Sequence, residues 1–352
     1  MNQYNSYYLY QQYEKRGNQD WLPSYPNIFS VDGDGTMPLV MKKENDPYCG
    51  YTGDTQPIYR WYNMPITTDY VCDVCPVYKL VAMYGVGNTY EIVCDDNTTL
   101  SRSDVRSGDY SYSAMTSAAI GNCITSIGDA AFDGCKSLAS INIPTSVTTI
   151  GQYTFADCRS LTSISIPYSV TSIGEGVFSN CSGLTSCTIG SSVTTISTYA
   201  FSRCRSLTRI NIPNSVTSIG NRAFRECTSL TSVTMGNNVT TIGDDAFSGC
   251  TSLTSIDIPD SVETIDSGVF TGCTNLTSCT IGSGITLINS WAFENCTGLT
   301  SVTVKATTPP HIGIYVFNNT NDCPIYVPSA SVDAYKAANR WSDYASRIQA
   351  IP

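Results

Sequence analysis

One pattern of apolar side chains repeats along most of this chain at an unbroken interval of 23 residues. Its most visible members are the phenylalanines Phe132, Phe155, Phe178, Phe201, Phe224, Phe247, Phe270 and Phe293. A cysteine follows each phenylalanine after three residues, from Cys135 to Cys296, and a leucine follows after six. A fixed period of this length is typical of a repeat architecture, in which similar units stack and share one core.

Each repeat predicts two short strands. The unit at residues 169–191 contains two apolar pairs with the alternating spacing of a strand. A single unit buries too few side chains to offset the entropy of ordering its backbone. Stacking of strand on strand, at about 4.8 Å per coil, would instead give a solenoid with continuous columns of Phe, Leu, Ile and Cys.

The segment from Leu207 to Cys227 reads L-x-x-I-x-I-P-x-x-V-x-x-I-G-x-x-A-F-x-x-C. This pattern resembles the BspA-like family of bacterial leucine-rich repeats, and the resemblance covers residues 120–322. It implies a β-rich solenoid with a recognition surface and no chemistry, because members of that family are mostly adhesins or binding proteins. The strand ends add a second period, which indicates that repeats duplicated in pairs. The alternating residues are Pro167, Gly190, Pro213, Gly236, Pro259 and Gly282.

We expect four parts in the chain. A Tyr-rich arm and linker at 1–47 precedes a small β domain at 48–115, the leucine-rich-repeat solenoid at 116–322 and a C-terminal cap at 323–352. The cap strongly resembles the terminal cap that follows such repeats, and Ser331 is expected to cap a short helix that begins at the next residue. Three aromatic residues of the cap are expected to pack against the end of the core: Tyr335, Trp341 and Tyr344.

The small β domain carries a second resemblance. The stretch QPIYRWYNMPITTDYVC from Gln56, followed by VYKLVAMYGVGNTYEIV, is similar to a module of proteins from Bacteroidales and their crAss-like phages. The residues that match are Tyr59, Arg60, Trp61, Thr68, Asp69, Tyr70 and Cys72. The chain departs from that module by lacking its Lys-Gln-rich strand and its S-x-D-G-G-x-T-W segment.

The first residues are rich in tyrosine and poor in aliphatic side chains, a composition better suited to a contact surface than to a core. We interpret this segment as a docking arm, and the alternative is a flexible or locally packed terminus. Its tyrosines are Tyr4, Tyr7, Tyr8, Tyr10 and Tyr13.

The 16 cysteines are not expected to form a disulfide framework. Eight occupy the repeat column, and Cys187 and Cys279 replace the strand isoleucine of two coils, so these ten are expected to be small, buried, reduced side chains. Outside the repeats one Cys-x-x-Cys occurs without a second close pair, so structural thiols are favoured over zinc or a redox role. The candidate ligands are Cys49, Cys72, Cys75 and Cys94. We expect no metal and no cofactor.

Composition restricts the classes of partner. A net charge of −10 and a pI near 4.5 argue against nucleic acid, whose phosphates need a basic face. No apolar run is long enough to span a membrane, and the N-terminal residues lack the basic start and apolar run of an export signal. We therefore expect no membrane insertion and no export by that route.

Catalytic motifs are missing from the sequence. It contains a single histidine, His311, in the irregular segment TTPPHIGIYVF. The sequence has no G-x-S-x-G, phosphate loop, H-E-x-x-H or dinucleotide-binding turn. We therefore expect a protein that is not an enzyme.

Departures from the repeat consensus mark the candidate binding residues, because a solenoid binds where its repeats differ. One set is basic and could hold an anionic sugar or a partner's carboxylates, with solvated charge as the alternative. It consists of Arg203, Arg205, Arg209, Arg222 and Arg225, with Lys136 and Arg159 in the column of Arg205. The second set is aromatic and could stack on sugars or anchor a partner. It consists of Tyr153, Tyr168, Tyr199 and Trp291.

These features predict a recognition protein. We favour a phage virion appendage, a tail or head fibre or decoration protein made in the host cytoplasm and carried on the virion surface. Its repeats would bind a host surface glycan or protein, and its N-terminal region would attach to other virion proteins and form any trimer through residues 1–115. The alternatives are a bacterial cell-surface adhesin and a cytoplasmic scaffold.

Overall fold

The structure is a computed structural model of the whole chain. It describes residues 39–44, 58–63, 83–84, 89–92, 99–102, 105 and 114–352, the first four segments as backbone only. The chain divides into two compact units, residues 1–80 and 81–352. In the first unit, β1 (Leu39–Glu44) pairs antiparallel with β2 (Ile58–Asn63).

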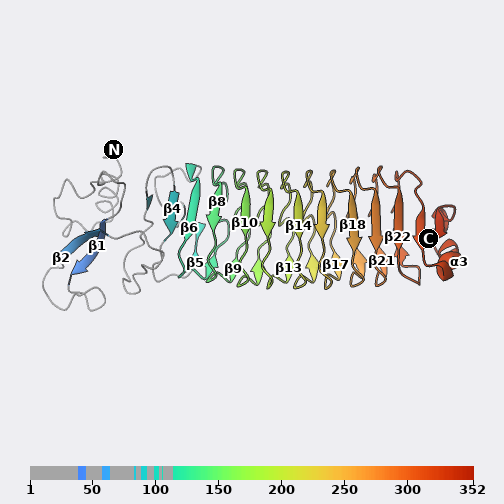
Figure 1. Cartoon of the computed structure of the whole chain (residues 1–352), viewed down its shortest axis with the longest axis horizontal. Coiled ribbons are helices and arrows are strands. Elements are labelled where there is room, and N and C mark those ends of the chain that lie inside the picture. The colour runs from blue at the N-terminus through green and yellow to red at the C-terminus, as the bar shows by residue number, and fades with distance from the viewer. Residues whose placement is uncertain are drawn as a thin grey trace. The chain divides into compact units, whose positions relative to one another are not determined.

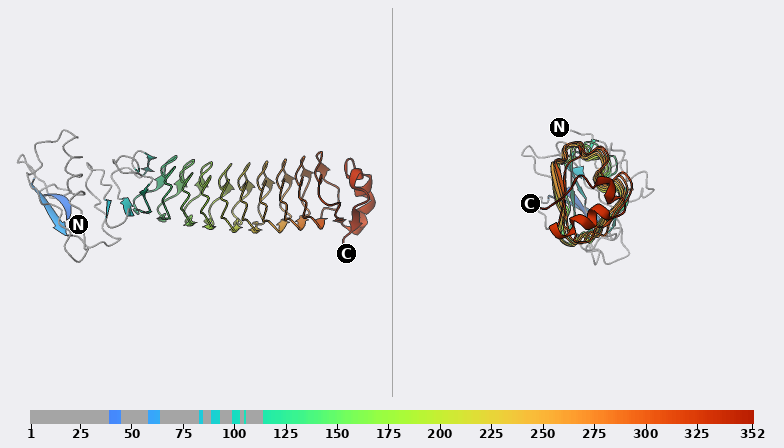
Figure 2. Two further views of the ribbon diagram at one scale, coloured as in Figure 1. Left: turned by 90° about the horizontal axis from the view of Figure 1, so that it is seen from above. Right: turned by 90° about the vertical axis from the view of Figure 1, so that its right-hand side faces the viewer.

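The second unit is a parallel β-solenoid, which confirms the predicted fold class (Figure 1). Each coil adds one strand to a row of longer strands and one two-residue strand to a second row. Most neighbours in each row pair in parallel and in register, so that Ile196, Ile219 and Ile242 lie side by side. Seen along its axis, the solenoid presents its coils stacked over one another (Figure 2).

The longer row consists of β4 (Thr89–Ile92), β6 (Ser117–Ile120), β8 (Ser140–Asn142), β10 (Ser163–Ser165), β12 (Ser186–Thr188), β14 (Arg209–Asn211), β16 (Ser232–Thr234), β18 (Ser255–Ile258), β20 (Ser278–Ile281), β22 (Ser301–Val304), β24 (Ile325–Val327) and β25 (Ile348–Ala350). The second row consists of β5 (Thr99–Leu100), β7 (Ser126–Ile127), β9 (Thr149–Ile150), β11 (Ser172–Ile173), β13 (Thr195–Ile196), β15 (Ser218–Ile219), β17 (Thr241–Ile242), β19 (Thr264–Ile265), β21 (Leu287–Ile288) and β23 (His311–Ile312). A short strand, β3 (Met83–Tyr84), pairs antiparallel with β4.

The phenylalanine column forms the centre of the core. Successive rings from Phe132 to Phe317 are stacked with centroids 5.1 to 5.6 Å apart, and all of them are buried. This spacing lies within the range of favourable aromatic pairs. Phe317 continues the column after a step of 24 residues, so it lies outside the strict 23-residue period.

The cysteine column is a ladder of thiol hydrogen bonds. The Sγ of Cys158 donates to the main-chain oxygen of Phe132 at 3.3 Å, and the same bond recurs in each following coil up to Cys296 and Phe270. The thiols from Cys158 to Cys296 are free of disulfides. Cysteine therefore fills a small apolar site that also needs a weak donor.

The alternation of proline and glycine at the strand ends has a steric cause. A Cβ at Gly236 would lie 2.5 Å from the main-chain oxygen of Pro213, and one at Gly282 would lie 2.5 Å from that of Pro259. Because the coils that carry Pro213 and Pro259 bring their backbone this close to the following coil, glycine is required at positions 236 and 282.

The cap closes the C-terminal end of the core. It consists of η3 (Ser329–Ser331), α3 (Val332–Ala337), η4 (Trp341–Tyr344) and β25, which extends the longer row. The buried Trp341 donates its Nε1–H to the oxygen of Pro310 at 2.8 Å, and the buried Tyr335 donates its hydroxyl to Ala306 at 2.8 Å. Both residues pack as expected.

Two details differ from the sequence-based expectation. Ser331 precedes α3, but its side chain forms no cap and donates instead to the oxygen of Thr307 at 2.7 Å. Strand pairing with the solenoid already begins at β4 and β5, inside the segment expected to form a separate small β domain. The expectation depended on the strict Phe-x-x-Cys pattern, and these first strands lie before that pattern starts.

Candidate functional site

Two positions in each coil have a left-handed backbone, two residues before and two residues after the phenylalanine. We call them positions −2 and +2, and the two columns together the left-handed edge. Position −2 holds Ala130, Tyr153, Gly176, Tyr199, Arg222, Asp245, Gly268, Trp291 and Tyr315, all with φ between 51° and 64°. Position +2 holds Gly134, Asp157, Asn180, Arg203, Glu226, Gly249, Gly272, Asn295 and Asn319, with φ between 56° and 75°.

The left-handed backbone is a requirement of the fold. It costs a non-glycine residue about 1–2 kcal/mol, but it directs main-chain N–H groups toward the next coil. Tyr153 donates to the oxygen of Glu175 at 2.7 Å, and Asp157 donates to that of Ser179 at 2.8 Å. The backbone of the edge is therefore constant, and its side chains are what varies from coil to coil.

Side chains at position −2 extend along the edge toward the next coil. The ring of Tyr153 covers the position that a Cβ on Gly176 would take, and Oδ1 of Asp245 lies 2.6 Å from such a position on Gly268. Tyr153 also donates its hydroxyl to Glu175. That hydrogen bond, together with burial, raises the pKa of Tyr153 to about 12.

Tyr199, Arg222 and Asp245 form a chain across three coils. The guanidinium of Arg222 donates to the hydroxyl of Tyr199 through Nη1 and pairs with Oδ2 of Asp245 through Nε at 3.2 Å. Its Cζ lies 5.6 Å from the centre of the Tyr199 ring. The hydrogen bonds to Tyr199 and then to Asp245 raise the pKa of Arg222. Sequence reasoning proposed Tyr199 and Arg222 as members of two separate sets, and the structure brings them together.

Beside this chain, three arginines converge on one carboxylate. Arg203 and Arg205 approach Oε2 of Glu226 at 3.3 and 3.4 Å, and Arg225 approaches Oε1 at 3.8 Å. Burial raises the pKa of Glu226, but the arginine charges outweigh it and hold that pKa below its ordinary value. Two positive charges remain in excess at this place.

This arginine cluster contributes little to stability, because exposed ion pairs are worth about 0–1 kcal/mol. The guanidinium groups of Arg203 and Arg205 remain about half exposed, at 52% and 55% of their side chains. Planar, exposed guanidinium groups with one shared carboxylate retain donors for carboxylate or sulfate groups of a ligand. In a protein of net charge −10, this is a local reversal of charge.

Other predicted residues lie apart from the cluster. Arg209 is the first residue of β14 and forms no ion pair with any residue that the structure describes. Tyr168, exposed by 66%, lies in the turn between β10 and β11, away from the left-handed edge. Trp291 is at position −2, exposed by 41%, three coils beyond Arg222.

The predicted docking arm, Tyr4, Tyr7, Tyr8, Tyr10 and Tyr13, and the cysteines Cys49, Cys72, Cys75 and Cys94 lie outside the described residues. Within the described part of the chain, no group of three or more His, Cys, Asp or Glu side chains could hold a metal ion. In the same part, no helix is long and apolar enough to cross a membrane.

The repeats identify the family. Residues 103–230 and 194–324 match the family described as BspA type leucine rich repeat region, with six copies. The chain belongs to this family. Its BspA-type repeats therefore cover the solenoid, as the sequence pattern predicted, whereas the likeness of the N-terminal region to phage or Bacteroidales modules has no match of this kind. The comparison with curated proteins found no match.

Solved structures with similar repeats come from several bacteria. A leucine-rich repeat protein of Bacteroides ovatus is 24% identical, with a TM-score of 0.41, and the match covers 68% of this chain and 84% of that one. The leucine rich repeat protein TpLRR of T. pallidum is 23% identical, with a TM-score of 0.40 and coverage of 67% and 84%. A leucine rich cell surface protein of Faecalibacterium prausnitzii is 24% identical, with a TM-score of 0.27 and coverage of 64% and 86%.

Proposed function

We propose that this BspA-type protein is a non-enzymatic recognition protein that binds a surface glycan or protein through its left-handed edge. The observation that carries the proposal is the convergence of Arg203, Arg205 and Arg225 on the single carboxylate of Glu226. Such a cluster selects a partner that presents carboxylates or sulfates. The neighbouring Tyr199 ring adds an amphipathic surface to the same edge.

The repeats support recognition in a second way. Buried positions hold the same residue type in almost every coil, for example Phe, Cys and Leu, whereas position −2 holds Tyr, Gly, Arg, Asp and Trp. Side chains at this position do not pack in the core, so the fold leaves them free to differ. A rigid scaffold with a variable edge suits binding of one particular partner.

We place the protein on the surface of a phage particle, as a tail or head fibre or decoration protein. Support comes from the resemblance of residues 56–93 to modules of crAss-like phage and Bacteroidales proteins, in which β2 contains the Tyr-Arg-Trp triplet. The N-terminal region would then attach to other virion proteins. The second candidate is a bacterial cell-surface adhesin, which membership in the BspA-type family favours.

Mass spectrometry of purified virions, of washed cell-surface fractions and of the cytoplasmic fraction from one producing culture separates the two candidates. Recovery in virions at a fixed ratio to the capsid protein is the expected result. Recovery on cell surfaces alone would overturn the virion location and make the protein an adhesin. Recovery only in the cytoplasmic fraction would overturn both.

A further inference from the structure

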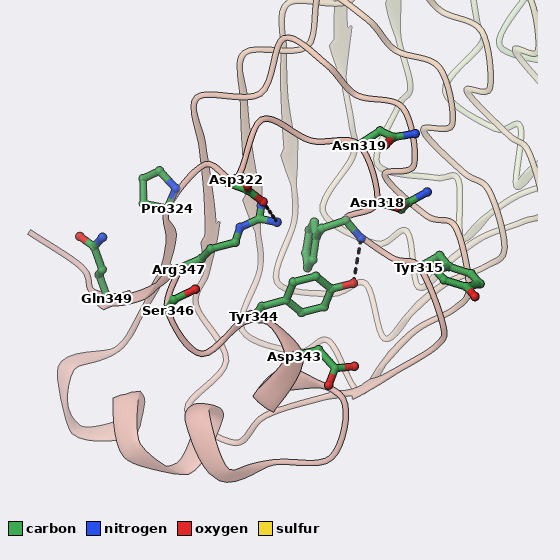
Figure 3. Close-up of a pocket in the computed structure, with 11 residues that line it drawn as sticks. Tyr315, Asn318, Asn319, Asp322, Pro324, Asp343, Tyr344, Ser346, Arg347 and Gln349 are labelled. Atoms are coloured by element: carbon green, nitrogen blue, oxygen red, sulfur yellow. Dashed lines mark hydrogen bonds and ion pairs between the residues drawn. The ribbon is translucent and has the colours of Figure 1, made fainter.

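The last coil and the cap form an open pocket of about 500 Å³, which we call the terminal pocket (Figure 3). One wall comes from residues 315–324 of the last coil and the other from residues 343–349 of the cap. The pocket therefore lies at the end of the phenylalanine column. If the solenoid had one more coil, the residues around the phenylalanine of that coil would occupy this space. Its volume is in the range of small-molecule sites.

The hydrogen-bond ladder of the left-handed edge is incomplete at this pocket. In the preceding coils, main-chain N–H groups at position −2, at the phenylalanine and at position +2 donate to the next coil. At the last coil, Phe317 N–H donates instead to the Tyr344 hydroxyl at 3.4 Å. The N–H groups of Tyr315 and Asn319 find no acceptor in the described part of the chain. Two ladder donors therefore border the pocket unpaired.

A buried arginine supplies a third donor. Arg347 is only 8% exposed, and its Cζ lies 5.7 and 5.5 Å from the ring centres of Phe317 and Tyr344. Nε donates to the oxygen of Cys323 at 2.8 Å, and Nη2 donates to Oγ1 of Thr320 at 3.0 Å. Nη1 makes no hydrogen bond to a described residue and has only Oδ1 of Asp322 at 3.8 Å. Nη1 faces the pocket as a donor that is available to an acceptor there.

Acceptors lie beside these donors. The Asn319 amide nitrogen donates back to Asn295 at 2.8 Å, which leaves its own Oδ1 at the end of the ladder. The carboxylates of Asp322 and Asp343 also line the pocket, and the Asp322 side chain is 97% exposed. Together with Arg347 they give the pocket one negative charge in excess, which disfavours an anionic ligand.

Two further features restrict the ligand. The Tyr344 hydroxyl already occupies the middle acceptor position of the ladder, so a peptide cannot pair with all three N–H groups as a coil does. The Tyr315 ring, 58% exposed, lines the pocket and offers an apolar face. Mixed donors and acceptors with one aromatic face suit the hydroxyl groups and C–H face of a sugar.

We propose that the terminal pocket binds a neutral sugar residue. Its hydroxyls would accept from Arg347 Nη1 and from the N–H groups of Tyr315 and Asn319, and would donate to Asp322. This proposal rests on the proposed recognition function, to which it adds a ligand class and a second site separate from the arginine cluster.

The test is saturation-transfer NMR and titration with the methyl glycosides of glucose, galactose, mannose and N-acetylglucosamine, beside methyl glucuronide as the acidic probe. At least one neutral glycoside should receive saturation and methyl glucuronide should not. Ser346→Trp, which fills the pocket, should abolish the signal. Tyr315→Ser should lower affinity about five- to tenfold through loss of the aromatic face.

Ile314→Ser is the matched control, because Ile314 is an exposed apolar residue directly before Tyr315 and does not line the pocket. This variant should bind the sugar as the unmodified protein does, and equal thermal unfolding of all variants would show that they fold. Absence of saturation for every neutral glycoside, signal that survives Ser346→Trp, or preference for methyl glucuronide would each overturn the proposal. Loss of these signals alone, with cell binding through the arginine cluster retained, would leave the proposed function intact.

Discussion

The thiol of Cys181 lies 3.0 Å from the main-chain oxygen of Phe155 in the preceding coil. The same oxygen accepts the N–H of Cys158 from its own coil at 3.2 Å. A carbonyl oxygen has two lone pairs, so the thiol satisfies the one that the coil itself leaves open. The cysteine column thus joins adjacent coils by hydrogen bonds, without any disulfide.

Stability should fall at alkaline pH because of these thiols. Burial raises the pKa of Cys227 to about 12, whereas a thiol in an unfolded chain ionises near pH 8.5. The contribution of each buried, protonated thiol to the free energy of unfolding is therefore fully present below about pH 8.5. It is lost as pH rises toward 12, by about 1.4 kcal/mol per pH unit for each thiol. Urea unfolding at a series of pH values from 7 to about 10 measures the slope. The free energy of unfolding of Cys227→Ala should fall less steeply with pH, because this variant lacks the contribution of one thiol. Equal pH slopes for both proteins would contradict this account.

Phe224→Ala should destabilise the solenoid by about 3–5 kcal/mol, because it leaves a cavity between two stacked rings. Phe224→Leu, which keeps most of the volume, should cost less. Ser232→Ala, at an exposed position of β16, should change the unfolding free energy by less than about 0.5 kcal/mol. Urea unfolding checks the order of the three variants. A loss for Phe224→Ala as small as that for Ser232→Ala would show that the rings do not form a packed column.

Gly282→Ala should cost more than about 1 kcal/mol. The new Cβ would lie 2.5 Å from the carbonyl of Pro259, and the contact atoms are main chain, which cannot move aside easily. Ser283→Ala, at the next residue, adds no atom toward Pro259 and should be nearly neutral. Thermal unfolding compares the stability of the two variants, and Gly282→Ala should have the lower Tm. Equal Tm values would contradict the steric explanation of the proline and glycine alternation.

Trp341→Ala should destabilise the C-terminal end by about 3–5 kcal/mol. It removes the packing on Tyr335 and Phe317 and leaves the oxygen of Pro310 without its donor. Trp341→Phe keeps a ring and loses only the N–H, so its cost should be about 1–3 kcal/mol. The exposed column end should also make the alanine variant associate at high concentration, which light scattering detects. A monomeric alanine variant of unchanged stability would contradict the role of the cap.

The periodic part of the fold was predictable because each buried residue recurs and the period alone sets the stacking. The left-handed backbone at Tyr153, Arg222 and Trp291 was not, since these residue types rarely adopt positive φ and the glycines that share their column are few. Arg222 and Tyr199 were separate candidates in sequence and became one contact only once coils were stacked. The terminal pocket was missed because Arg347 acts with a coil that ends more than twenty residues earlier.

Binding of fluorescently labelled protein to intact bacterial cells of the producing culture tests the central claim most directly. The comparison is between Arg205→Ser with Arg222→Ser and the control Lys305→Ser with Lys336→Ser, which removes two positive charges away from the left-handed edge. We predict that the arginine pair of substitutions reduces cell binding at least about tenfold, as loss of charge-paired contacts in a binding surface does, and that the lysine pair leaves it unchanged. Equal binding by the two variants would contradict recognition through the edge.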